Sequence, residues 1–303
     1  MNMKQIRLFA TLLMVALAAT SCITWVDKNN ENNNSSSSGG SNNLKAGQIV
    51  IKVYPDKDNK VSFSATTGKI TIDWGDGNID KLTPNGTMQE FSHSYPNNNL
   101  QTIYIESEKL QGLGKGGGSY AQVWGGKGVI KELYLGEMNE LNELFCSNGG
   151  LTVLEIKKAN VLTTLWCFNN QLTSLDLRGC TILNVLDCSE NQLTSLNVSG
   201  LKALTTIYCG GNQLTSLNVS GCTALTSLYC SSNQLTSLNV SGCTALTSLY
   251  CSSNQLTSNN LNSLFESLPN RLAKEGTIDI RGNPGSSTCN IAIAKNKGWV
   301  FYY

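Results

Sequence analysis

The chain repeats itself every 21 residues across much of its second half. Leucines at equivalent places begin successive units, at positions Leu151, Leu172, Leu193, Leu214, Leu235 and Leu256. Two units are identical, and each reads LTSLNVSGCTALTSLYCSSNQ. A unit of this length cannot bury an apolar face alone, so successive units must stack on one another. The period therefore predicts a solenoid over 130–255, with a divergent first unit that opens at Ile130.

The pattern inside each unit predicts how a coil is built. The segment LTSLYCSSNQL has the form L-x-x-L-x-L-x-x-N-x-L, with cysteine in the third apolar place, and it resembles the leucine-rich-repeat signature. The pattern occurs twice in each unit, which predicts two short extended segments per coil. Leu228 and Cys230 should point inward and Tyr229 outward, because side chains alternate along a strand. Stacked coils would then pair as parallel sheets.

Two inward ladders are expected from the repeat. One consists of cysteines and the other of asparagines: Cys146, Cys167, Cys188, Cys209, Cys230 and Cys251, then Asn170, Asn191, Asn212, Asn233 and Asn254. We expect the cysteines to act as small buried hydrophobes and the asparagine amides to satisfy backbone groups at the turns. Metal binding is disfavoured because no C-x-x-C pair is present. Disulfides between coils stay open, because an exported protein meets oxidising conditions.

One outward column of the solenoid is predicted to be rich in aromatic residues. The residues that precede the ladder cysteines are Phe145, Trp166, Asp187, Tyr208, Tyr229 and Tyr250. The equivalent column of the second segment is polar and contains Tyr134, Glu155, Asp176, Asn197, Asn218 and Asn239. Exposed aromatics suit protein hot spots or the apolar faces of sugars. They are also good strand formers that a duplicated repeat copies, so the column has a purely structural alternative.

The tail 256–303 is expected to cap the array, since an open end would expose the core. A helix is predicted over about 260–268, then a strand and turn in TIDIRGNPG, a short helix over 289–295 and a final strand in WVFYY. The GNPG turn and the sequence Lys297-Gly298-Trp299 resemble the C-terminal cap of bacterial leucine-rich-repeat lipoproteins.

Residues 47–111 form a different region, with period-2 runs separated by turns. This pattern predicts a small antiparallel β-sandwich. The segment ITIDWGDG, with Trp74, and the later His93 and Tyr95 resemble the landmarks of PKD-type immunoglobulin-like domains, which serve as spacers or adhesion modules. We expect a structural role for His93. The acidic segment 73–80 favours a β-turn over calcium binding, because its spacing departs from the calcium-loop motif.

Residues 112–129 are interpreted as a glycine-rich connector. Gly112, Gly114 and Gly117 spell G-x-G-x-x-G, but no amphipathic helix of useful length follows them. The segment therefore lacks the context of a nucleotide-binding loop.

The N-terminus has the features of an export signal. Lys4 and Arg7 precede an apolar run, and the segment ending at Cys22 resembles the lipobox of bacterial lipoproteins. That resemblance implies cleavage after 1–22 and lipid attachment at Cys22; an ordinary secretory signal is the alternative. Residues 23–46, rich in Asn, Ser and Gly, are predicted to be a disordered tether. Similarity to Bacteroidetes-type surface lipoproteins implies an outer-membrane location that faces the exterior, with the periplasmic side left open.

Charge and composition exclude several functions. The formal net charge is +1, which disfavours nucleic-acid binding. A single histidine and the lack of a nucleophile-base pair at diagnostic spacing disfavour an enzyme. We therefore expect a mainly β, monomeric, non-enzymatic lipoprotein without cofactors or metals. Its repeat face is expected to bind an extracellular or host protein; the alternative is a glycan-binding accessory lipoprotein of a nutrient-uptake system.

Overall fold

The structure is a computed structural model that describes residues 44–55, 60–66, 69–82, 89–107, 112–113 and 129–302. The predicted signal peptide, its Cys22, most of the tether and most of the glycine-rich connector lie outside these ranges. Residues 44–303 belong to one compact unit. Within the described ranges, no helix combines the length and apolar character needed to cross a bilayer.

The N-terminal region is built from antiparallel strands. Their bounds are β1 (Gln48–Tyr54), β2 (Lys60–Thr66), β3 (Ile70–Asp73), β4 (Ile79–Leu82), β5 (Gln89–Ser94), β6 (Gln101–Ser107) and β7 (Gly112–Leu113). In one sheet β1 pairs with β6, β6 with β3, and β3 with β4; in the other β2 pairs with β5 and β7. Alternate residues such as Ile49, Ile51 and Ile72 are buried, as the period-2 pattern predicts. The PKD-type resemblance stays a prediction.

Both sheets of this region continue into the coils. β8 (Val129–Leu135) pairs antiparallel with β1 and parallel with β10 (Val153–Glu155). β7 pairs antiparallel with β2 and parallel with β9 (Glu143–Phe145). The N-terminal strands therefore cover the first coil, which would otherwise expose its backbone groups. The domain boundaries given above stay predictions, but backbone pairing joins the two regions.

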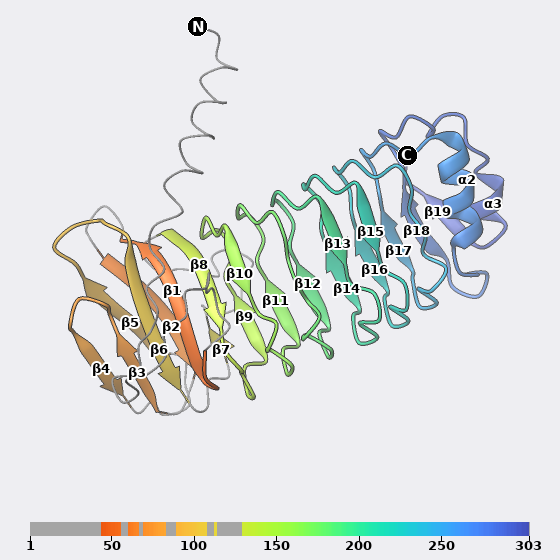
Figure 1. Ribbon diagram of the computed structural model, residues 1–303. Coiled ribbons are helices and arrows are strands. Elements are labelled where there is room, and N and C mark those ends of the chain that lie inside the picture. Colours follow the sequence, from red (N-terminus) through yellow and green to blue (C-terminus); the bar gives the residue numbers. More distant parts are fainter. Residues whose placement is uncertain are drawn as a thin grey trace, which may run out of the picture. The chain divides into compact units, whose positions relative to one another are not determined.

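The coils stack as a parallel sheet, with the strands side by side in Figure 1. After β9 these strands are β11 (Thr164–Trp166), β12 (Val185–Asp187), β14 (Thr206–Tyr208), β16 (Ser227–Tyr229) and β17 (Ser248–Tyr250). Each residue pairs with the equivalent residue of the next coil; Ile207, for example, pairs with Leu228. The predicted solenoid is confirmed.

The second extended segment appears in only some coils. β13 (Ser195–Asn197) pairs with β15 (Ser216–Asn218), and β10 pairs with β8. The equivalent residues Leu175 and Leu238 still face the core, but their backbone forms no strand. The prediction of two strands per coil is therefore correct for part of the array. The predicted alternation of inward and outward side chains also holds in coils where the second segment forms no strand.

The asparagine ladder connects neighbouring coils from inside. Asn212 Nδ2 donates to the carbonyls of Cys188 (3.0 Å) and Cys209 (3.2 Å), while its Oδ1 accepts from the amide of Leu193 (3.0 Å). Equivalent bonds to backbone groups recur at Asn170, Asn191, Asn233 and Asn254. Asn283 of the cap continues the same pattern. The predicted role of the amides is confirmed, and the repeat itself did not reveal Asn283.

The cysteine ladder packs inside the coils. Its members are at most 1% exposed. A second inward set, Cys180, Cys222 and Cys243, places its sulfur atoms near backbone carbonyls of the preceding coil. All of these cysteines are free thiols, and burial raises their pKa above the ordinary value. The expected packing role of the ladder is confirmed.

The C-terminal segment closes the other end of the array. It contains α2 (Ser258–Ser267), β18 (Gly276–Asp279), α3 (Ala292–Lys295) and β19 (Trp299–Phe301). α2 begins at Ser258, earlier than predicted, because Thr257 caps its first turn. β18 and β19 add to the sheet beyond β17, and Leu264 and Phe265 of α2 are buried. The order of elements predicted for the cap is confirmed.

Candidate functional site

The register of the coils brings the predicted outward residues into one line. Within each strand of this sheet the central leucine or isoleucine is buried, and the residue after it lies on the outer face. Strand pairing places each such residue beside its counterpart in the next coil. We call this line the aromatic column; it contains Phe145, Trp166, Asp187, Tyr208, Tyr229 and Tyr250.

Three tyrosines of the column form a continuous stack. The ring centroids of Tyr208 and Tyr229 are 4.6 Å apart with an interplanar angle of 13°, and those of Tyr229 and Tyr250 are 4.8 Å apart at 9°. These spacings match the separation of neighbouring strands, about 4.8 Å, so the coil repeat itself sets the stack. Both faces of the Tyr229 ring are covered by its neighbours. The stack therefore presents ring edges and hydroxyl groups to the surroundings.

Phe145 differs from the expectation. Its side chain is 8% exposed, and its ring meets Trp166 edge-on, with centroids 5.0 Å apart at 61°. The prediction of an exposed ring at Phe145 is wrong, because the side chain is buried with its ring packed against that of Trp166 in the next coil. Trp166 remains partly exposed and Tyr208 is 37% exposed.

Tyr302 extends the column beyond the repeats. Its ring lies 5.5 Å from that of Tyr250, and its side chain is 48% exposed. A hydrogen bond with Tyr302, together with burial, raises the pKa of Tyr250. The repeat does not reveal Tyr302, because the cap does not follow the 21-residue period. The alternation in WVFYY, which continues the sheet in β19, was the signal available in the sequence.

Asp187 interrupts the column between Trp166 and Tyr208. Its Oδ1 accepts hydrogen bonds from the amide (3.1 Å) and the hydroxyl (2.5 Å) of Ser189. Burial raises the pKa of Asp187 above its ordinary value, although the bonds from Ser189 act in the opposite direction. A carboxylate is thus held in a partly desolvated place among aromatic side chains.

The second outward column has a different chemistry, as predicted. Asn197, Asn218 and Asn239 are exposed, and each side chain accepts a bond from the backbone amide two residues later. Tyr134 is bonded through its hydroxyl to Glu132, and Glu155 forms an ion pair with Lys157. These polar side chains serve local turns and pairs, and no ring contact links neighbouring coils along them in the described structure.

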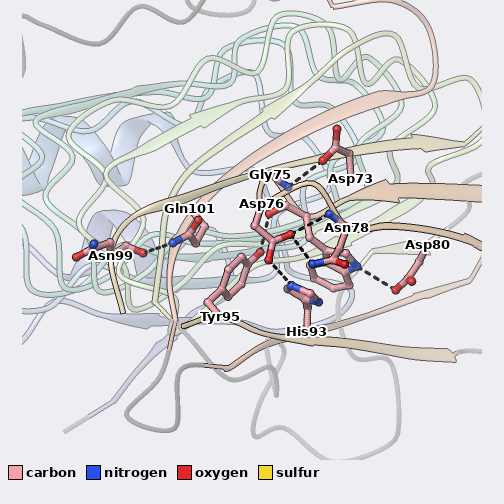
Figure 2. Close-up of polar contacts among 10 residues, drawn as sticks. Asp73, Gly75, Asp76, Asn78, Asp80, His93, Tyr95, Asn99 and Gln101 are labelled. Atoms are coloured by element: carbon pink, nitrogen blue, oxygen red, sulfur yellow. Dashed lines mark hydrogen bonds and ion pairs between the residues drawn. The ribbon is translucent and has the colours of Figure 1, made fainter. Parts of the chain in front are cut away.

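The polar cluster of the N-terminal region is held together by local bonds (Figure 2). Asp76 Oδ2 lies 2.7 Å from His93 Nε2, and the bonds from His93 and Asn78 keep the pKa of Asp76 low even though burial acts to raise it. Tyr95 donates to the carbonyl of Trp74 (2.8 Å) and Trp74 Nε1 donates to Asp80 (2.9 Å). These contacts suit the structural role expected for His93.

Metal ligands do not gather anywhere in the part of the chain that the structure describes. No group of three or more His, Cys, Asp or Glu side chains there could hold an ion. The aspartates of the predicted turn instead accept bonds from it, for example Asp73 from the amide of Gly75.

This chain resembles a number of solved structures. The functional domain of InlJ from Listeria monocytogenes, described as including a cysteine ladder, is 25% identical over 58% of this chain and 50% of its own, with a TM-score of 0.42. YopM, a leucine-rich effector protein from Yersinia pestis, is 25% identical over 50% of this chain and 47% of its own, with a TM-score of 0.37. The chain thus spans about half the length of each. No protein-family model and no curated protein matches it.

Proposed function

We propose that this chain is a non-enzymatic, lipid-anchored surface protein that captures a protein partner through the aromatic column of its solenoid. The observation that carries the proposal is the stack of Tyr208, Tyr229 and Tyr250 on the outer face of the coils. Tyrosine and tryptophan provide much of the binding energy at protein interfaces, since a rigid ring loses little entropy and its hydroxyl offers a polar contact.

The ring geometry favours a protein over a glycan. A sugar stacks its apolar face on an exposed ring face. The rings of the stack cover one another at 4.6 and 4.8 Å, so the central ring has no free face. Ring edges and hydroxyls suit the mixed polar and apolar surface of a protein instead. The coils that carry the stack have no charged side chain between Lys202 and Glu266, so they add no charge that would repel either kind of partner.

The test is capture of ligands by the full chain, purified in mild detergent, from a panel of extracellular-matrix proteins and polysaccharides. In a four-alanine variant of Trp166, Tyr208, Tyr229 and Tyr250, we expect capture of the protein ligand to fall at least tenfold while circular dichroism still reports a folded chain. A matched control changes Gln192, Gln213 and Gln234 to alanine, because these side chains are exposed on the same coils. Equal capture by both variants would place the binding site elsewhere.

A conservative variant separates ring edges from hydroxyls. Changing Tyr208, Tyr229 and Tyr250 to phenylalanine keeps the stack but removes the three hydroxyls. Since each hydrogen bond contributes about 0.5–1.5 kcal/mol and three hydroxyls are removed, we expect protein capture to weaken at least tenfold. Polysaccharide capture that survives in this variant and is lost with alanine would support the glycan alternative and contradict the choice of a protein ligand.

The lipid anchor and its location are tested separately. We propose that Cys22 carries the lipid and that the solenoid faces the cell exterior. In a bacterium that processes lipoproteins, the wild-type chain should incorporate radiolabelled palmitate and sediment with outer membranes, whereas Cys22→Ser should do neither. Protease added to intact cells should degrade the solenoid; protection until the outer membrane is permeabilised would indicate the periplasmic side.

A further inference from the structure

Asp187 lies where the column has a gap between two aromatic side chains. Its neighbours in register are Trp166 in β11 and Tyr208 in β14. Coils lie about 4.8 Å apart, so positions two coils apart are separated by roughly 9.6 Å. A cation that reaches Asp187 would therefore have an aromatic residue in register on either side, and a cation is attracted to an aromatic face within about 6 Å of the ring centroid. We call this place, bounded by Trp166, Asp187 and Tyr208, the acidic slot.

Only one of the two carboxylate oxygens of Asp187 accepts the hydrogen bonds from Ser189. Both hydrogen bonds from Ser189 end on Oδ1. Within the described part of the chain, Asp187 forms no ion pair. None of the neighbouring strands of this face, ELF, TLW, VLD, TIY and SLY, carries a lysine or arginine. No lysine or arginine of these five described strands therefore balances the negative charge of the slot.

Two other aspartates of the same solenoid show what such a carboxylate binds. Asp279, which pairs in register with Tyr250, contacts Arg281 through both oxygens, at 2.9 and 2.8 Å. Asp176 on the opposite face contacts Arg178 in the same way. In both cases the arginine is the second residue after the aspartate. At Asp187 that position is Ser189, so the guanidinium is missing.

The electrostatic consequences follow this difference. Hydrogen bonds from Arg178 lower the pKa of Asp176 to about 2, and those from Arg281 lower the pKa of Asp279. Burial instead raises the pKa of Asp187. A guanidinium group bound to Asp187 would stabilise the charged form of this carboxylate, as Arg178 and Arg281 stabilise those of Asp176 and Asp279.

We propose that the acidic slot binds an arginine side chain of the protein partner. Arginine fits better than lysine because its planar guanidinium stacks between rings and donates two parallel hydrogen bonds to a carboxylate. This inference rests on the proposed function, since the partner is the protein captured by the aromatic column. It adds that the partner presents an arginine next to the residues that meet the tyrosine stack.

The probe for the test is a fluorescent peptide with three arginines separated by Gly-Ser spacers. Its matched control carries citrulline, which is neutral but has nearly the same shape. With the full chain in mild detergent, fluorescence anisotropy should show binding of the arginine peptide at least tenfold tighter than that of the citrulline or lysine peptide. Asp187→Asn should reduce arginine-peptide binding about tenfold, because it removes the charge and keeps the acceptor for Ser189.

The control for net charge is Asp176→Asn, which removes the same charge from the opposite face and should leave peptide binding within twofold of wild type. Equal binding of arginine and citrulline peptides, or an equal loss in both aspartate variants, would overturn the proposal. Circular dichroism and thermal unfolding verify that each variant is folded.

A third variant separates this inference from the proposed function. Asp187→Tyr fills the slot with the residue that the later coils carry, so it should fold and should abolish selectivity for arginine over citrulline. If the slot binds the partner's arginine, capture of the protein ligand should fall about tenfold although the tyrosine stack is intact. Undiminished capture by this variant, with capture still lost in the four-alanine variant, would reject the slot and leave the proposed function standing.

Discussion

The N-terminal strands and the coils are stabilised in different ways. In the N-terminal region each core contact occurs once: Trp74 is fully buried, donates to Asp80 and accepts a bond from Tyr95 at its carbonyl. In the coils one set of contacts recurs every 21 residues, as the bonds of Asn212 and Asn233 illustrate. A unique contact therefore concentrates stability in one residue, whereas a repeated contact distributes it along the array.

The largest effect is expected at the unique contact. Trp74→Ala should lower the free energy of unfolding by about 3–5 kcal/mol, because it empties a large buried site and leaves Asp80 without its donor. Denaturant unfolding followed by circular dichroism measures the loss. Trp74→Phe is the control: it keeps most of the buried area, so its cost should be clearly smaller. A loss below about 1 kcal/mol for Trp74→Ala would show that the N-terminal core does not depend on this residue.

A smaller effect is expected inside the repeated ladder. Asn212→Ala removes bonds to the amide of Leu193 and to the carbonyls of Cys188 and Cys209. An unsatisfied buried group costs about 1–3 kcal/mol, so the free energy of unfolding should fall by about 2–3 kcal/mol. The same change at Asn233 should cost the same within error, since its bonds are equivalent. Unequal costs would mean that the coils are not energetically alike.

The same contrast decides what the sequence could reveal. Where contacts repeat, the period predicted the coils, the inward ladders and the outward position of Tyr229. Where contacts join segments far apart in the chain and do not repeat, the sequence predicted less of the structure. β7 pairs with β9 and so joins the N-terminal strands to the coils, and the place of Tyr302 depends on the pairing of β19 with β18 in the cap. Neither pairing produces a regular spacing of residues in the sequence from which it could be predicted. Pairing of β1 with β8 is equally non-local, and so the continuity of the two sheets was not predicted.

The column of rings also needed the structure. The sequence showed that Tyr208, Tyr229 and Tyr250 share a face, but it did not show that their rings lie flat on one another. Ring orientation depends on side-chain torsions that the repeat does not specify. The role of Asp187 was missed for a related reason, because it looked like an exception to an aromatic column. The role proposed for Asp187 follows from a comparison with Asp279, whose carboxylate is bonded by Arg281.

The next effect on stability, between those at Asn212 and Cys230, is expected when a ring is removed from the stack. Tyr229→Ala loses two ring contacts, each worth about 0.5–1.5 kcal/mol, and should lower the free energy of unfolding by about 1–3 kcal/mol. Tyr229→Phe keeps both contacts and should change stability by less than about 0.5 kcal/mol. Thermal unfolding of both variants provides the measurement. A cost near that of Trp74→Ala would show that the stack acts as core and not as an outer face.

The smallest effect is expected for a single thiol of the ladder. Cys230→Ala removes one buried sulfur, similar in size to a methyl group, and should cost about 1 kcal/mol. The same substitution at Cys188 or Cys251 should cost equally, since each thiol is buried among equivalent coils. Unequal costs, measured by denaturant unfolding, would mean that the thiols differ in packing from coil to coil.

The thiols also report whether the coils open. Burial raises the pKa of Cys230 to about 12, so little thiolate exists near pH 8 and alkylation of the native chain should be slow there. Cys289, which is partly exposed, should react first. Rapid alkylation of several ladder thiols under native conditions, measured by mass spectrometry, would mean that the coils open locally and that repeated contacts distribute instability as well as stability.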